Sequence, residues 1–409
     1  MSVNKLSISG FKAFAKYQEI NINKLTLIFG YNNTGKSAIL RAIPLLAESF
    51  KKKEKKYYTH SYLNYNSNSI RGASFSDLKN KTARRIGLGI SFDDSDSLYF
   101  QLQKDGFENE RISTLTKVEN SLEEKYRQTA ECEYILESES GEKINTLNFD
   151  FLKETSIGYK IKDFSTSVSW ISSTRKYPPR YFDIGPNVEV CINNDGTGVG
   201  ETIWYLNENK SESFNLINEW LINTCGREFK MDITSQTSSD NGKRTVSLDT
   251  VPVSSETENE ENRVAILDSG EGIAQALPVV TLAAMAANGE LGDSPIIAIE
   301  QPELHLHPNA IVILADFIVE CINKNTDARF IIETHSESFL LALQMAIVKK
   351  ELGIDDFSCY WVSKNSEGSV AEEVELDEDG FIISNWPASV FREVINQSKE
   401  LIKFRKEKK

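Results

Sequence analysis

The octapeptide GYNNTGKS at residues 30–37 constrains the fold of this chain more than any other segment. It fits the pattern G-x-x-x-x-G-K-[ST] in full, with an apolar run (KLTLIFG) before it and helical spacing (SAILRAIPLLAESF) after it. In such a loop the backbone N–H groups surround phosphates, the lysine reaches the β- and γ-phosphates, and the hydroxyl after it binds Mg²⁺. The pattern therefore predicts a site for ATP and Mg²⁺ formed by Gly30, Asn32, Asn33, Thr34, Gly35, Lys36 and Ser37.

A second apolar run, IIAI, is followed by Glu300 in the segment IIAIEQPELHLHP, residues 296–308. We predict that Glu300 is the Mg²⁺ carboxylate of the same site, together with Ser37. Many nucleotide-hydrolysing enzymes place a second carboxylate at the next position, but here it is Gln301, which cannot accept a proton. Three alternatives follow: Glu303 reaches the attacking water, His335 assists a slow turnover, or the chain binds ATP and switches without hydrolysis. We favour slow hydrolysis, with Gln301, Glu303 and His335 as the catalytic residues.

A third glycine-rich segment, DSGEGIAQALP at residues 268–278, precedes an apolar run with helical character. A free helix N-terminus preceded by glycines is another site for an anion. Two helix starts that can each bind a phosphate are expected in one chain if two protomers face each other. One protomer then contributes GYNNTGKS, and the other contributes Gly270 and Gly272 to the same γ-phosphate.

Composition restricts the partners and the compartment. The chain has 409 residues, enough for two or three domains, and a net charge of -14, which argues against general coating of nucleic acid. Two short basic runs, at 51–56 and from 403 onward, are exceptions. The five cysteines are scattered, and neither a signal sequence nor a membrane-length apolar run is evident, so we expect a cytoplasmic protein.

The order of patterns predicts an α/β fold with an antiparallel lobe. Alternating helix and strand signals from residue 270 onward favour a parallel sheet. An edge strand is expected at 6–14, an antiparallel meander from 85 to 161 that includes a strand at 158–164, and a short helix within 110–128. Heptads do not continue, so no long coiled coil is expected. We predict a discontinuous head at 1–50 and 165–345, a β-rich lobe at 51–164, and a small C-terminal domain at 346–409.

Taken in order, LSISGFKAF, GYNNTGKS, DSGEGIAQALP, IEQPELHLHP and ETHSE resemble a family. They look like the ABC-type, AAA-family ATPases related to chromosome-maintenance, RecF and overcoming-lysogenisation-defect proteins. STRKYPPRYF and the segment at 375–393 resemble other recurring parts of these ATPases. The resemblance implies an ABC-type P-loop head with a mixed sheet that dimerises around two ATP molecules. It also implies a signature helix start at 268–275, which includes Ser269, and assigns His335 as the switch histidine.

By the same resemblance, stand-alone ATPases of this kind often act with a separate effector protein in bacterial anti-phage defence. We therefore expect a homodimer, with higher order possible, a partner effector and no membrane association. Two alternatives remain open: a DNA-repair or DNA-end-binding ATPase that acts directly on nucleic acid, and a non-hydrolysing, ATP-dependent scaffold. DNA affinity that depends on salt, together with DNA-stimulated hydrolysis, distinguishes the first alternative.

Overall fold

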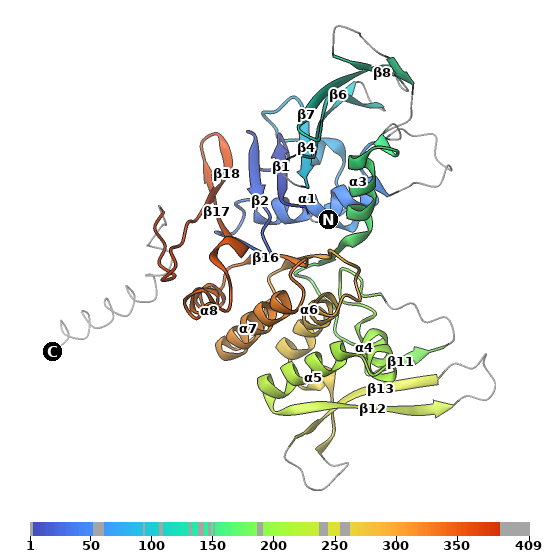
Figure 1. Cartoon of the computed structure of the whole chain (residues 1–409). Helices are drawn as coiled ribbons and strands as arrows, with labels where there is room; N and C mark the ends of the chain where they lie inside the picture. The colour runs from blue at the N-terminus through green and yellow to red at the C-terminus, as the bar shows by residue number, and fades with distance from the viewer. Residues whose placement is uncertain are drawn as a thin grey trace, which may run out of the picture.

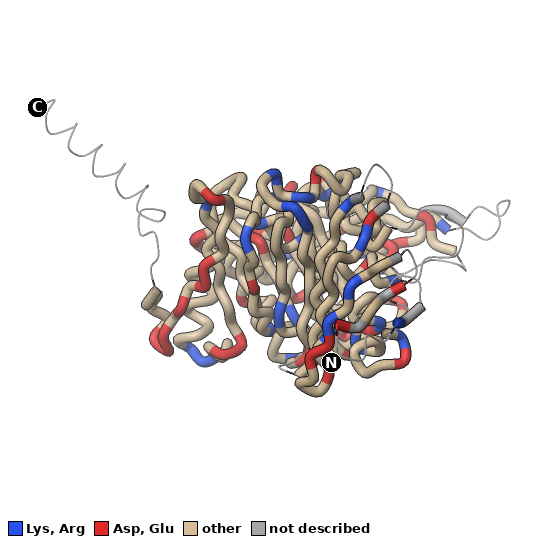
Figure 2. The backbone as a smooth tube through the Cα atoms, turned by 90° about the horizontal axis from the view of Figure 1, so that it is seen from above, with Lys and Arg blue, Asp and Glu red and all other residues tan. Residues whose placement is uncertain are grey.

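The computed structural model describes residues 3–51, 61–92, 95–105, 109–130, 133–137, 143–145, 149, 152–185, 191–236, 244–253 and 262–384. Three β-sheets and the helices packed on them make up this part of the chain (Figure 1). The basic runs at 52–56 and after 403 lie outside the described residues, so the nucleic-acid alternative stays a prediction. Along the described backbone, positive and negative residues are interspersed (Figure 2).

The central sheet has six strands and carries the glycine-rich loop of residues 30–37. Its order is β10 (Val168–Ile171), β15 (Ile296–Glu300), β16 (Arg329–Thr334), β3 (Leu25–Gly30), β17 (Phe357–Asn365) and β18 (Gly368–Glu373). Neighbouring strands are parallel except β17 and β18. Parallel strands covered on both faces are nearly continuous apolar runs, as β3 and β15 are. The carboxyl ends of β3, β15 and β16 therefore meet at one edge of the sheet.

Helices cover both faces of this sheet. One face packs against α6 (Glu271–Ala287), α7 (Pro308–Lys324) and α8 (Glu337–Val348), and α5 (Glu212–Cys225) packs in turn against α6 and α7. The other face packs against α1 (Lys36–Phe50) and α3 (Ser156–Ser167). Alternation along β3 explains both contacts, because Leu25, Leu27 and Phe29 belong to the first core and Ile28 to the second.

An antiparallel sheet of eight strands forms the lobe beyond α1 and α3. It runs β2 (Gln18–Asn21), β1 (Lys5–Ser9), β4 (Ile86–Ser91), β5 (Ser97–Asp105), β6 (Asn109–Glu119), β7 (Leu122–Ala130), β8 (Glu133–Leu136) and β9 (Lys143–Asn145). The expected α/β class with a mixed sheet and an antiparallel lobe is thus confirmed. The longest described helices, α6 and α7, have 17 residues each, and none of the described helices combines the length and apolarity needed to cross a membrane.

The third sheet lies beside α4 (Val199–Glu208) and α5. It contains β11 (Tyr181–Ile184), β13 (Arg244–Pro252) and β12 (Arg227–Gln236), with β14 (Val264–Ala265) paired to β13. A one-turn helix, α2 (Phe75–Leu78), completes the described helices. Strand β4 of the predicted lobe pairs with β1, and β17 of the predicted C-terminal domain pairs with β3. The division into three domains stays a prediction.

Three local predictions are wrong. Strand β1 is not an edge strand, because it lies between β2 and β4. Residues 158–164 belong to α3, where Ile157, Ile161 and Phe164 are buried at helical spacing and the Thr155 side chain caps the first turn. The helix expected within 110–128 is instead the hairpin of β6 and β7. Its two turn residues, Asn120 and Ser121, have positive φ, as a tight hairpin turn requires.

Candidate nucleotide site

The loop between β3 and α1 has the backbone that phosphate binding needs. Gly30 has φ 150°, Asn33 has φ 63° and Gly35 has φ 108°. A Cβ on Gly30 would lie 2.4 Å from the Val362 carbonyl oxygen, so no side chain fits there. Gly35 occupies the N-cap of α1 with no side-chain cap, which leaves the first N–H groups of this helix available to an anion.

Lys36 and Ser37 are the first two residues of α1 and carry the ammonium and the hydroxyl of the motif. The Lys36 ammonium donates to the Tyr31 carbonyl oxygen at 2.6 Å, and the Thr34 hydroxyl donates to the same oxygen at 2.9 Å. Burial lowers the pKa of Lys36, although Glu333 and Glu303 oppose this shift. The Ser37 hydroxyl donates to Glu333 Oε1 at 2.9 Å. The loop is therefore ordered by its own contacts, with its cation and its hydroxyl in place.

A cavity of about 1030 Å³ opens over the loop. Asn32, Asn33, Gly35, Lys36 and Ser37 line it, together with Gln301, Glu333 and His335 from the ends of β15 and β16. Its remaining cationic lining residues are Lys12, Arg41, Lys79, Lys81 and Lys364. A cluster of cations in a chain of net charge -14 suits a polyphosphate ligand.

Glu300, at the end of β15, is 1% exposed and fully engaged. Arg41 Nε donates to Glu300 Oε1 at 2.5 Å, and Arg41 Nη2 donates to Oε2 at 2.6 Å. The Ser173 N–H and hydroxyl both donate to Oε2 at 3.3 Å. This two-pronged contact neutralises the carboxylate within the protein. Glu300 is not among the described residues that line the cavity.

The residues predicted for catalysis take different positions. Gln301 lines the cavity, and its φ is 46°. Glu303 is not among the described lining residues, and its Oε1 accepts from the Thr334 hydroxyl at 2.6 Å and from the His335 N–H at 2.9 Å. Burial raises the pKa of Glu303. This carboxylate therefore fixes the backbone that carries His335.

His335 follows β16 and lines the same cavity as the loop of residues 30–37. Burial is the main cause that lowers the pKa of its imidazole, and the positive charge of Lys36 lowers it further. A neutral imidazole at neutral pH can still donate one N–H to a phosphate oxygen. The role of His335 as a sensor of the γ-phosphate stays a prediction.

Arg175 links the end of β15 to the glycine-rich helix start. It is buried, and it donates to the carbonyl oxygens of Glu300 at 2.5 Å, Gln301 at 2.9 Å and Gln275 at 3.2 Å. Burial lowers the pKa of Arg175 to about 10, so the guanidinium remains charged at neutral pH. Because Gln275 belongs to α6, this one side chain joins the acidic strand end to the helix that begins at Gly270.

The start of α6 is open on its outer side. Gly270 is the N-cap, with φ 117°, and a Cβ there would meet nothing within 4 Å. Gly272 behaves differently, since a Cβ on it would lie 2.3 Å from the His305 carbonyl oxygen. The Ser269 hydroxyl lies 3.1 Å from the Thr250 hydroxyl. None of Ser269, Gly270 and Gly272 is among the described residues that line the phosphate-loop cavity.

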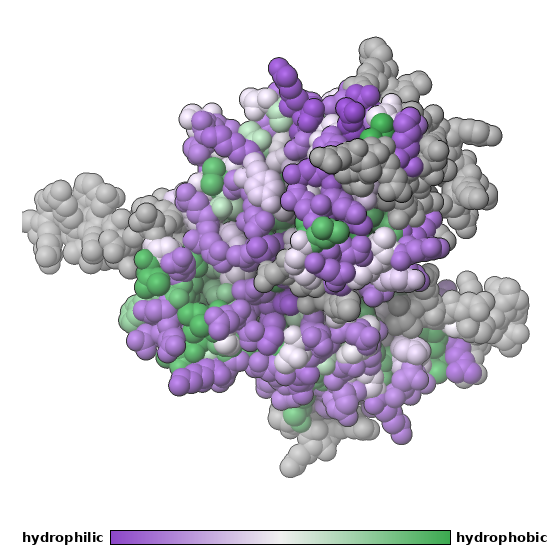
Figure 3. All heavy atoms as spheres, turned by 45° about the horizontal axis from the view of Figure 1, so that its top comes forward, coloured by the Kyte–Doolittle hydropathy of each residue, from purple (hydrophilic) through white to green (hydrophobic). Residues whose placement is uncertain are grey.

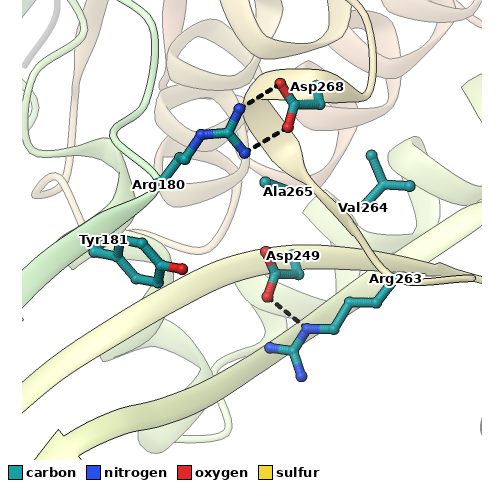
Figure 4. Close-up of a pocket in the computed structure, with 7 residues that line it drawn as sticks. All are labelled: Arg180, Tyr181, Asp249, Arg263, Val264, Ala265 and Asp268. Atoms are coloured by element: carbon teal, nitrogen blue, oxygen red, sulfur yellow. Dashed lines mark hydrogen bonds and ion pairs between the residues drawn. The ribbon is translucent and has the colours of Figure 1, made fainter. Parts of the chain in front are cut away.

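A smaller cavity of about 500 Å³ lies behind this helix start (Figure 4). Arg180 pairs with Asp268 through two hydrogen bonds, of 2.5 and 2.9 Å, and Arg263 pairs with Asp249 at 2.5 Å. Each arginine therefore forms an ion pair with a carboxylate that also lines the cavity. The first pair fixes the residue that precedes Ser269.

Sequence reasoning missed two residues of the site, Arg41 and Glu333. A signal for Glu333 was present, because FIIE at the end of β16 repeats the apolar-run-then-acid pattern of IIAIE in β15. Glu300 and Glu333 are register partners on these neighbouring strands. For Arg41 the sequence offered only its position one turn after Ser37.

Comparison with known proteins defines the class. Residues 1–180 and 197–340 match the AAA ATPase domain family, and because this is more than half of the chain, the protein belongs to that family. No curated protein matches the chain at a significant level. The resemblance inferred from the motifs is thus confirmed at the level of the family.

Three solved structures of Smc heads are similar to this chain. An Smc head bound to the C-winged helix domain of ScpA aligns with a TM-score of 0.51 and 14% identity, over 92% of this chain and 99% of that one. The SMC head domain from Thermotoga maritima aligns with a TM-score of 0.45 and 14% identity, over 92% of this chain and 100% of that one. An Smc head with an extended coiled coil, bound to the C-terminal domain of ScpA derived from Pyrococcus furiosus, aligns with a TM-score of 0.49 and 12% identity. The alignment covers 91% of this chain and 96% of that one. The first of these shows that this chain shares the fold of such a head.

Proposed function

We propose that this protein is a slowly hydrolysing ATPase subunit that closes as a homodimer around two ATP molecules and regulates a separate effector. The observation that carries the dimer is the separation of two phosphate-binding segments within one chain. The loop at 30–37 lines the cavity, whereas Ser269, Gly270 and Gly272 are not among its described lining residues. The open side of Gly270 leaves this helix start free to meet a phosphate held by another copy.

In this proposal each residue has a defined task at the nucleotide. The loop N–H groups and Lys36 bind the phosphates, which requires Lys36 to exchange the Tyr31 carbonyl oxygen for a phosphate oxygen. Ser37 and a strand-end carboxylate hold Mg²⁺, whose chemistry when bound is to offset the charge on the phosphate oxygens. His335 donates to the γ-phosphate. Ser269, Gly270 and Gly272 of a second copy complete the cavity.

Slow hydrolysis follows from the groups near the attacking water. Gln301 lines the cavity and can orient water, but its amide cannot take the proton. Glu303 is not among the described residues that line the cavity, and its Oε1 accepts from the Thr334 hydroxyl and the His335 N–H. A general base typically contributes about 10²–10⁴-fold, so its absence leaves turnover slow while binding persists.

An exposed apolar patch supports the effector part of the proposal. We define this patch as Leu341, Met345, Val348, Phe381 and Ile383, each between 48% and 69% exposed. Gln344 of α8 donates to the Gly380 carbonyl oxygen at 2.7 Å, which brings the two segments of the patch together. Figure 3 shows an apolar area on the side of the molecule where α8 lies. Exposed apolar clusters commonly bind partner proteins. The similar Smc head of known structure is bound to a domain of ScpA. The anti-phage role rests on the resemblance of the motifs.

Light scattering with and without Mg-ATP tests the dimer. The wild-type chain is expected to double its mass when Mg-ATP is added. Gly270→Glu places a side chain and a negative charge at the helix start and should prevent doubling while ATP still binds. Gly292→Glu is a matched control, because Gly292 also has positive φ and open space around its Cα. A Gly270→Glu protein that doubles as fully as the control refutes the facing dimer.

A further inference from the structure

Two buried carboxylates lie side by side at the phosphate-loop edge of the central sheet. Glu300 ends β15, and Glu333 is its register partner on β16. Both are nearly inaccessible, at 1% and 4% exposed. A buried carboxylate needs either partners within the protein or a cation. The two residues differ in which of these they have.

Glu300 has its partners within the protein. Its Oε1 accepts from Arg41, and its Oε2 accepts from Arg41 and from two donors of Ser173. To bind a metal ion, Glu300 would have to give up an arginine that is itself only 11% exposed at its side chain. It is also outside the described lining of the cavity.

Glu333 lacks such partners on one side. Its Oε1 accepts from the Ser37 hydroxyl at 2.9 Å, but its Oε2 is buried without a hydrogen-bond partner among the described residues. Glu333 lines the cavity beside Lys36 and Ser37. A hydroxyl and a carboxylate oxygen are both ligands that Mg²⁺ accepts, and Mg²⁺ in nucleotide sites is typically held by one or two carboxylates plus phosphates.

We propose that Glu333, with Ser37, holds the divalent cation of the nucleotide site, directly or through a metal-bound water, and that Glu300 is a structural anchor for Arg41. Ser37 keeps its hydrogen bond to Oε1 and offers a lone pair, while Oε2 turns to the cation. This inference rests on the proposed function, because it assumes that ATP occupies the cavity. The cation is thereby assigned to Glu333 on β16 rather than to Glu300 at the end of β15.

The test measures how much Mg²⁺ strengthens nucleotide binding. A fluorescent ATP analogue is titrated into the full chain with Mg²⁺ and again with EDTA, and the ratio of the two affinities is the metal gain. Glu333→Gln should reduce this gain by about tenfold or more, as loss of a metal-holding group does. It should leave the EDTA affinity as tight as that of the wild type, or tighter, because a negative charge beside the phosphates is removed.

Glu300→Gln and Glu337→Gln are the comparison variants. Both should keep the wild-type metal gain, and Glu337 is a matched control because it lies two residues after the cavity residue His335 and is not among the described lining residues. If Glu300→Gln fails to fold, Mn²⁺ paramagnetic resonance tests the assignment of Glu333 without that variant. The spectrum of protein-bound Mn-ATP should change in Glu333→Gln and stay the same in Glu337→Gln.

The outcomes separate this inference from the proposed function. A wild-type metal gain in Glu333→Gln, or an equal loss in Glu337→Gln, overturns the assignment of Glu333 while ATP binding stands. A wild-type chain that binds ATP equally well with Mg²⁺ and EDTA does the same. A wild-type chain that binds no nucleotide under either condition overturns the proposed function, and the metal site with it.

Discussion

The ends of β15 and β16 have similar sequences and different surroundings. Each strand places a glutamate after an apolar run, and the two glutamates are register partners on these neighbouring parallel strands. Glu300 on β15 is held by Arg41 and Ser173, whereas Glu333 on β16 contacts Ser37 and keeps one oxygen without a partner in the described structure. The comparison teaches that the position of an acid in a motif does not by itself give its role. The groups packed around it do.

The largest effect is expected from breaking the ion pair on β15. Arg41→Met leaves Glu300 buried without its cation, which should lower the free energy of unfolding by about 3–5 kcal/mol. Urea denaturation measures the change, and the double variant Arg41→Met with Glu300→Met should recover much of the loss. Lys24→Met is the control, because its pair with Asp356 is partly exposed and should cost about 1 kcal/mol or less. Equal losses in Arg41→Met and Lys24→Met would show that the β15 pair is not the anchor we describe.

A smaller effect is expected when a proton acceptor is placed after β15. Gln301→Glu should raise the single-turnover rate of phosphate release by about 10²-fold, the lower end of what a general base contributes. Glu303→Gln should keep the wild-type rate, because its oxygen can still accept from Thr334 and His335. Loss of phosphate release in Glu303→Gln would instead make Glu303 the base. No release from the wild type, with ATP tightly bound, would establish the switch without hydrolysis.

The smallest effect is expected at the exposed pair behind the helix start. Arg180 and Asp268 are about half exposed at their side chains, in contrast to Arg41 and Glu300. Solvent screens such a pair, so Arg180→Ala should leave the thermal midpoint unchanged within error. A clear loss of thermal stability would mean that this pair anchors α6 as firmly as Arg41 anchors β15.

Sequence reasoning located the phosphate loop and the strands around it because their signals are local. Glycines that need positive φ, a lysine after the second glycine and an apolar strand all fall within a few residues of one another. It failed where the outcome depends on distant residues or on a turn. Strand β1 received a second neighbour in β4, about 80 residues later, and the Asn120–Ser121 turn was not recognised. The pairing of Arg41 with Glu300 spans 259 residues, so no local pattern could reveal it.

The central claim is that ATP binds at the loop of residues 30–37, and calorimetric titration of ATP into the wild type and Lys36→Ala tests it most directly. Lys36 is buried, and in the proposed site it makes a charge-assisted contact to the phosphates, so its removal should abolish measurable ATP binding. The circular dichroism spectrum and thermal midpoint should remain those of a folded chain, because in the described structure Lys36 donates only to the Tyr31 carbonyl oxygen. An ATP affinity in Lys36→Ala equal to that of the wild type would contradict the account.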